Sequence, residues 1–257
     1  MPTDRLLSLA AGVCPETGPA DFVASCAAAG WRACGVWFDA ATWDEGVATE
    51  VRRRLDDTGL VALDMEPIFV TPDGDHGDRV IDAAAAVGAR NLLVVSRGVD
   101  DGRFAERVTE LCDLAAAHGI GCSVEFMAFM SVRDLPQALS VLDAVDRPNA
   151  SVLIDSLHLA RTGGSPTDVA AIDPARLPYV QLCDAPARAP DDLVREALDG
   201  RSTLGAGALP IDELLAALPE RTAVSMEVRS AELRTRFPDP IDRARHVLTT
   251  TIAFLRR

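Results

Sequence analysis

The sequence predicts an α/β protein that folds as a single (β/α)8 barrel, the TIM-barrel architecture, over residues 1–257. Apolar stretches of strand length alternate along the chain with stretches of helical periodicity, and this alternation gives eight strand–helix units. Several strand stretches are apolar at consecutive positions, as parallel strands covered on both faces are. The length of 257 residues also suits one barrel of about 250 residues. An open doubly wound sheet is disfavoured because no G-x-G-x-x-G follows the first strand.

The first half of the chain supplies four of these units. Gly30, Gly59, Gly88 and Gly119 directly follow the expected helices, where a left-handed residue often ends a helix. The expected elements, strand then helix, are residues 6–13 and 19–29, 33–38 and 49–58, 60–69 and 75–87, and 91–95 and 103–118.

The second half continues the alternation to the C-terminal helix. No linker or low-complexity stretch interrupts it, so we expect one domain. The longest irregular stretch, residues 184–210, follows the seventh strand, and in a barrel it would lie over the C-terminal face. The expected elements are residues 120–129 and 135–145, 150–159 and 167–177, 179–183 and 211–218, and 223–228 and 241–255.

The composition excludes several reaction classes. All 25 basic residues are arginines, because the sequence contains no lysine. Schiff-base aldolases, pyridoxal-phosphate enzymes and P-loop nucleotidases each need a lysine amine and are therefore excluded. The 39 acidic residues give a net charge of −14, which disfavours nucleic acid and anionic membranes as partners.

The cysteines and the N-terminal segment bear on localisation. Six cysteines lie in apolar stretches without C-x-x-C or zinc-finger spacing, which predicts buried free thiols in a reducing compartment. The N-terminal residues lack the pattern of a signal peptide, and no apolar run approaches the roughly 18 residues of a membrane span. We therefore expect a soluble, cytoplasmic protein.

Polar residues capable of binding a metal stand near the ends of the last four predicted strands. Glu125, Asp155, Gln181 and Glu227 each follow an apolar run. One such residue alone would be an ordinary polar group at a strand end. Four on consecutive strands converge on the C-terminal mouth of a barrel. Carboxylate and amide oxygens favour one divalent ion, Mn²⁺ or Mg²⁺, with Co²⁺ as a further candidate.

With these residues in place, the whole chain resembles the xylose isomerase-like TIM-barrel superfamily of sugar isomerases, epimerases and dehydratases. The resemblance rests on Glu125, on the D-x-x-H of Asp155 and His158, on Q-L-C-D-A-P at 181–186, and on Glu227. It implies that Glu125, Asp155, Gln181 and Glu227 bind one divalent metal ion.

Gln181 departs from the histidine that is commoner in the sugar epimerases. The resemblance associates glutamine at this place with 3-dehydroshikimate dehydratases, which gives weight to a lyase. The epimerases also place an arginine shortly after this ligand, where this chain has Ala187 followed by Arg188. The apurinic-endonuclease branch is rich in histidine ligands, and it does not suit a chain with four histidines and a charge of −14.

The shared chemistry of the superfamily is abstraction of a proton next to a carbonyl, through an enediolate. Glu125 or Glu227 would remove the proton, and the other would return or relay it. His158 would act as a proton shuttle or bind the substrate. Three further residues near strand ends are candidate substrate contacts: Glu66, Arg97 and Arg229. The arginines suit an anionic group, although a surface salt bridge is an equal interpretation for Glu66 and Arg97.

The functional prediction is therefore a metal-dependent isomerase or epimerase of a polyhydroxylated keto compound. A dehydratase acting on a dehydroshikimate or keto-inositol substrate is the first alternative, and a non-catalytic ligand-binding or partner subunit is the second. The expected partners are a small polyol, keto-sugar or sugar-like acid and, in addition, other copies of the chain in a homo-oligomer. The segment 196–210 resembles a family loop that closes over the substrate, with Gly205 and Gly207 permitting the motion.

Overall fold

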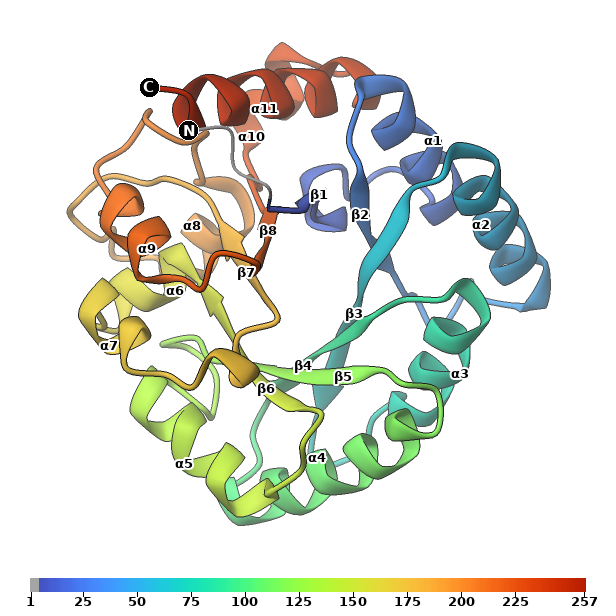
Figure 1. The fold of residues 1–257 in the computed structure, drawn as a ribbon, viewed down its shortest axis with the longest axis vertical. Coiled ribbons are helices and arrows are strands. Elements are labelled where there is room, and N and C mark those ends of the chain that lie inside the picture. Colours follow the sequence, from blue (N-terminus) through green and yellow to red (C-terminus); the bar gives the residue numbers. More distant parts are fainter. Residues whose placement is uncertain (1–4) are drawn as a thin grey trace.

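The computed structural model describes residues 5–257, in which eight parallel strands close into one barrel. Each strand pairs with the next one in the sequence, and β8 completes the ring by pairing with β1. Figure 1 looks along the barrel, with the helices in a ring outside the strands. The predicted (β/α)8 barrel is thus confirmed. The strands are β1 (Leu7–Leu9), β2 (Ala33–Trp37), β3 (Val61–Val70), β4 (Asn91–Ser96), β5 (Gly121–Glu125), β6 (Ala150–Asp155), β7 (Tyr179–Leu182) and β8 (Ala223–Met226).

The helices begin and end largely where the sequence indicates. Aspartates cap several of them, and Asp44, Asp100 and Asp134 each accept a hydrogen bond from a backbone N–H in the first turn. Two single 3-10 turns, Ala11–Val13 and Pro174–Arg176, accompany the helices. The α-helices are α1 (Pro19–Ala29), α2 (Glu45–Thr58), α3 (Gly77–Val87), α4 (Asp101–Ala116), α5 (Leu135–Val145), α6 (Ser156–Arg161), α7 (Pro166–Ala170), α8 (Leu193–Asp199), α9 (Ile211–Ala217), α10 (Ala231–Arg236) and α11 (Pro240–Leu255).

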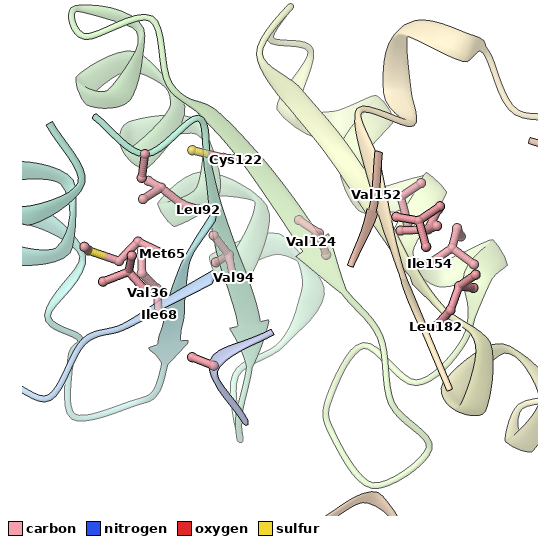
Figure 2. Packing of buried hydrophobic residues seen from close by; sticks show 14 of the residues in the cluster. Val36, Met65, Ile68, Leu92, Val94, Cys122, Val124, Val152, Ile154 and Leu182 are labelled. Carbon is pink, nitrogen blue, oxygen red and sulfur yellow. The ribbon is translucent and has the colours of Figure 1, made fainter. Parts of the chain in front are cut away.

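Alternation along the strands sorts side chains between the helices and the barrel interior. Leu92 and Val94 of β4 belong to the large core cluster that the strands share with the helices (Figure 2). The alternate residues of the same strand, Leu93 and Val95, belong to a separate cluster inside the barrel. Val95 lies in register with Glu125 of β5, and neighbours in register point to the same face. Glu125 therefore points into the barrel.

The fifth and sixth strands are shorter than predicted. They end at Glu125 and Asp155, whereas the sequence predicted strands over 120–129 and 150–159. The helix α6 begins directly at Ser156, because the Asp155 carboxylate caps it. His158 consequently lies on a helix rather than on a strand.

Other segments also differ from prediction. The first strand, predicted over 6–13, ends at Leu9, and a 3-10 turn over Ala11–Val13 follows it. The helix expected over 167–177 is divided into α7 and the 3-10 turn, and Pro174 prevents a continuous helix because it lacks an N–H. Helix α8 lies within the stretch 184–210, which was expected to be irregular, and α10 follows β8 without having been predicted. Both helices are too short for a helical period to stand out.

The loop after α8 is tied to the strand β7 through Asp184. The buried carboxylate of Asp184 accepts hydrogen bonds from the backbone N–H groups of Gly205, Gly207 and Leu209, at 2.9–3.0 Å. A Cβ atom at position 207 would lie 2.4 Å from the carbonyl oxygen of Ala185. Gly207 is therefore required for close packing of this loop, a role that differs from the expected hinge.

The six cysteines are buried and free of disulfide bonds, as predicted. Within the part of the chain that the structure describes, every helix falls short of the length and apolar character of a membrane-crossing segment.

Arg243 joins the C-terminal helix α11 to the first strand–helix connection. It is 1% exposed and donates to the carbonyl oxygens of Val13, Phe237 and Pro238 at 3.1–3.3 Å. Its Nη1 also lies 2.7 Å from the carboxylate of Glu16. A single buried guanidinium thus satisfies three carbonyl groups where the last helix of the chain meets the segment after the first strand.

The substitution Arg243→Met should lower the free energy of unfolding by about 3 kcal/mol or more, because it leaves buried carbonyl groups without donors. Urea denaturation of the purified protein measures this change. Arg245→Met is the matched control, since Arg245 is 51% exposed, forms an ion pair with Asp242 three residues away on the same helix, and makes one long, exposed hydrogen bond to Ala28 O at 3.4 Å. The control should stay within about 0.5 kcal/mol of the unaltered protein. Equal losses in the two variants would contradict the structural role assigned to Arg243.

Candidate metal centre and active site

A cavity of about 170 Å³ opens among the C-terminal ends of the strands. Asp155 and Gln181 are completely buried, and each contacts a residue that lines the cavity. The structure thus brings all eight predicted site residues to one end of the barrel. The other six line the cavity itself: Glu66, Arg97, Glu125, His158, Glu227 and Arg229.

Asp155 occupies the junction of β6 and α6 and uses both carboxylate oxygens. Its Oδ1 accepts hydrogen bonds from the backbone N–H groups of Leu157 and His158, at 2.7 and 3.1 Å. Its Oδ2 lies 2.5 Å from Nη1 of Arg201. The same carboxylate therefore begins a helix and enters the centre of the site.

Glu125, Asp155 and His158 form a compact group in which one potential ligand atom from each lies within 4.8 Å of the others. His158 Nε2 is 3.9 Å from Glu125 Oε1. Burial lowers the pKa of His158 to about 4, so its ring is neutral at neutral pH and this contact is not an ion pair. A neutral imidazole next to two carboxylates can bind a metal ion or accept a hydrogen bond.

Gln181 of β7 faces Glu66 of β3 across the barrel. The Gln181 Nε2 donates to Glu66 Oε2 at 3.3 Å, and the backbone N–H of Ala11 donates to Glu66 Oε1 at 3.1 Å. The Oε1 of Gln181 is buried and has no hydrogen-bond partner among residues 5–257. A buried acceptor without a donor is costly, so this oxygen is available to a ligand.

Arg201 is the residue that the sequence analysis missed. It is 3% exposed, and its Nη1 lies 2.5 Å from Asp155 Oδ2 and 2.9 Å from Glu227 Oε2. Arg188, the nearest arginine to the position expected from the epimerases, is exposed. Arg201 comes twenty residues after Gln181, beyond α8, and no strand or helix pattern in that stretch indicates an inward direction.

Burial and mutual repulsion hold the carboxyl groups of the site in their protonated forms. Burial foremost, and then Asp64, raise the pKa of Glu66 to about 8. Burial likewise raises the pKa of Glu227 to about 8 against the attraction of Arg201, and it raises that of Glu125 well above the usual range with the help of Glu227. Asp155 differs: burial opposes its ionisation, but Arg201 and His158 outweigh it and lower its pKa to about 2.

The donor set fits a divalent metal ion. Four carboxyl groups gather at the site. Arg97 is exposed, and the two arginines that are not exposed, Arg201 and Arg229, can balance only two of these groups. A divalent cation would compensate the remaining two charges and favour their ionised forms. The unpaired Oε1 of Gln181 supplies a further hard oxygen donor.

Two of the three arginines that line the cavity, Arg97 and Arg229, lie against aromatic rings. The guanidinium of Arg97 lies 4.0 Å from the ring centre of Phe69, and that of Arg229 lies 5.9 Å from Trp37. Arg97 is exposed, whereas the Nε of Arg229 is buried and has no partner in the described chain. Gly12 makes room for Arg229, because a Cβ at position 12 would lie 3.1 Å from its Cδ.

A second polar group lies inside the barrel. Asp64 of β3 is completely buried, and neither of its carboxylate oxygens has a hydrogen-bond partner within residues 5–257. The hydroxyl groups of Ser8, Tyr179 and Ser225 are also buried and unpaired in the same part of the chain. Burial foremost, and then Glu227, raise the pKa of Asp64 to about 7.

Comparisons with known proteins agree with the barrel fold. A family model described as xylose isomerase-like TIM barrel matches residues 23–256. A 3-dehydroshikimate dehydratase of Pseudomonas aeruginosa is 26% identical over 183 residues, which cover 65% of this chain and 29% of the relative. An inosose isomerase of Bacillus licheniformis is 28% identical over 117 residues, which cover 45% of this chain and 41% of that protein. The matches thus span less than half the length of these curated relatives.

A solved structure, that of the IolI protein with a zinc atom, has the same fold. It superposes with a TM-score of 0.81, covering 96% of this chain and 97% of that chain, at 16% sequence identity.

The substitution Asp64→Asn should change how stability depends on pH. The folded-state pKa of Asp64, about 7, exceeds the usual value of 3.8, so the proton-bound carboxyl stabilises the fold below about pH 4. That contribution is lost as the pH rises to about 7. The variant should therefore gain stability relative to the unaltered, metal-free protein between pH 4 and 8, by roughly 4 kcal/mol. Urea denaturation across this range measures the gain.

Asp143→Asn serves as the control for this titration, because Asp143 is 70% exposed and pairs with Arg176 on the surface. Its difference from the unaltered protein should stay within about 0.5 kcal/mol at each pH. Parallel stability curves for Asp64→Asn and the unaltered protein would rule out a buried protonated carboxyl at position 64.

Proposed function

This chain belongs to the family of xylose isomerase-like TIM barrels, and on that basis we propose that it is a divalent-metal-dependent sugar isomerase or epimerase. Its relatives by sequence include enzymes named as a dehydratase and as isomerases. The proposed reaction moves a proton at the carbon next to the carbonyl of a polyhydroxylated keto compound. The substrate would be a small keto-sugar or polyol.

The observation that supports this reaction best is the pair Glu125 and Glu227. Both line one cavity, and burial raises the pKa of both carboxyl groups. The pKa of Glu227, about 8, lets this group take up and release a proton near neutral pH. One carboxylate would accept the proton from the substrate carbon, and the carboxyl of the other would return a proton to it.

Four residues would hold the metal ion: Glu125, Asp155, Gln181 and Glu227. When bound, a divalent ion would act as a Lewis acid that polarises substrate oxygens. The oxygen donors favour Mn²⁺ or Mg²⁺. The IolI protein, which shares the fold, was solved with a zinc atom, so zinc joins these candidates. His158, in contact range of Glu125 and Asp155, would orient the substrate or serve as an additional ligand.

The remaining cavity residues would bind and shield the substrate. Glu66 is held by Gln181 and Ala11, so its carboxyl can make a hydrogen bond to a substrate hydroxyl in a fixed direction. Trp37 and Phe69 contribute apolar walls, which exclude water from the reacting carbon.

A dehydratase is the second candidate, and two observations favour it. Arg97 and Arg229 both line the cavity, and a guanidinium group suits the carboxylate of a sugar-like acid. A glutamine, Gln181, also stands at the seventh-strand ligand position. One of the sequence relatives is named as a 3-dehydroshikimate dehydratase. Proton removal by the same carboxylates would then be followed by loss of a hydroxyl group as water.

The substitutions Glu125→Ala and Glu227→Ala should each lower kcat by about 10²–10⁴-fold, because each removes a proton-transfer group. Each should also lower the bound-metal content, measured by elemental analysis after dialysis. Steady-state kinetics on the active substrate gives the first readout. Full activity together with full metal content in both variants would refute the proposed centre.

A screen of ketoses, inososes and dehydroshikimate, with Mn²⁺- or Mg²⁺-loaded protein, should identify one active substrate class. EDTA-treated protein should be inactive and should recover when the ion is restored. A product of unchanged mass indicates isomerisation or epimerisation. Loss of one water, with a new ultraviolet absorption, indicates elimination. Absence of any bound divalent ion would instead favour a ligand-binding or partner subunit.

A further inference from the structure

We propose that Arg201 is a resident cation of the acidic centre, which bridges Asp155 and Glu227 until a divalent ion displaces it. The proposal rests on the proposed metal site and adds a competitor built into the chain. Arg201 would thus weaken metal binding while it stabilises the metal-free protein.

The contacts place the guanidinium between two proposed ligands. Its Nη1 is within ion-pair distance of both Asp155 Oδ2 and Glu227 Oε2, at 2.5 and 2.9 Å. The three side chains are 0–9% exposed, so water does little to screen the attraction. A metal ion bound through the same two oxygens would need the space and the lone pairs that Nη1 now uses.

The charge of Arg201 is permanent. Arginine stays protonated at any pH at which the protein is folded, so deprotonation cannot remove the competitor. A divalent ion held next to an unmoved guanidinium would meet a like charge in a poorly screened environment. Binding therefore requires that the guanidinium move away from the two carboxylates.

The structure offers a place for the displaced group. Arg201 itself lines the cavity of about 170 Å³, and its Nη2 already lies 3.4 Å from His158 Nε2 on the cavity side. Its backbone is held by the hydrogen bond from Arg201 N to Arg229 O, at 3.0 Å. A turn of the side chain into the cavity would also break the hydrogen bond from Arg201 Nε to Ala197 O, at 2.9 Å, while the backbone stays in place.

A second buried ion pair provides a matched comparison. Arg161 of α6 and Glu196 of α8 are both 4% exposed and approach to 2.6 Å. Neither belongs to the proposed ligands. Loss of Arg161 should cost stability as loss of Arg201 does, without relieving any repulsion against a metal ion.

The test measures Mn²⁺ binding by calorimetry to metal-free protein, together with thermal melting without metal. For Arg201→Met we expect a dissociation constant for Mn²⁺ at least tenfold lower than in the unaltered protein and a lower melting temperature of the metal-free form. Arg201→Gln, which can still make hydrogen bonds, should change in the same directions and covers the case in which the methionine variant does not fold. Arg161→Met should melt at a lower temperature with an unchanged Mn²⁺ affinity.

Crystals of the unaltered protein, grown with and without Mn²⁺, give a readout that needs no variant. With Mn²⁺ bound, the separation of Arg201 Nη1 from Asp155 Oδ2 should exceed roughly 4 Å, the limit of an ion pair. An intact bridge beside bound Mn²⁺, or weaker Mn²⁺ binding in the Arg201 variants, would overturn the proposal while leaving the metal site standing. Absence of Mn²⁺ binding in every protein would overturn the metal site itself.

Discussion

The crowding of buried carboxylates at the mouth of the barrel is the constraint on which the rest of the site depends. Four carboxyl groups gather there, each on a residue no more than 7% exposed: Glu66, Glu125, Asp155 and Glu227. Two of them end strands, Glu227 follows β8, and Glu66 lies within β3. Carboxylates that share a poorly solvated space repel one another and resist ionisation. They persist together only where cations, hydrogen-bond donors or protons compensate their charge. Three groups would compensate this negative charge: the backbone amides capped by Asp155, the guanidinium of Arg201 and the proposed metal ion.

The barrel provides the crowding through its geometry. Strands whose side chains alternate between the helices and the interior place every second residue inside, and closure brings the ends of all strands to one ring. Tyr179 and Ala223 belong to the interior cluster. Gln181 comes two residues after Tyr179, and Glu227 comes four residues after Ala223, so both occupy the interior face. The outer face can then be largely apolar, and the polar groups accumulate at the C-terminal mouth of the barrel.

The sequence alone could predict the fold, which follows from periodicity, and most of the polar residues that line or adjoin the cavity. The apolar runs fix the strands, and Glu125, Asp155, Gln181 and Glu227 interrupt those runs at comparable places. What it could not predict depends on contacts between distant segments. Arg201 enters the site from a short helix and a loop that Asp184 holds against β7, and neither has a periodic pattern. The boundary at Asp155 was missed because an apolar run continues past it into a helix.

Asp155 links the start of helix α6 to the acidic centre. Its carboxylate accepts hydrogen bonds from the first backbone amides of α6 and also contacts Arg201. The helix end and the site consequently form one cooperative unit. Replacement of the cation next to Asp155 alters the strength of the hydrogen bonds that its carboxylate accepts from the amides of Leu157 and His158. Those two amide protons are therefore natural reporters: their chemical shifts and their exchange with solvent register occupancy of the centre from within the backbone, without any added probe.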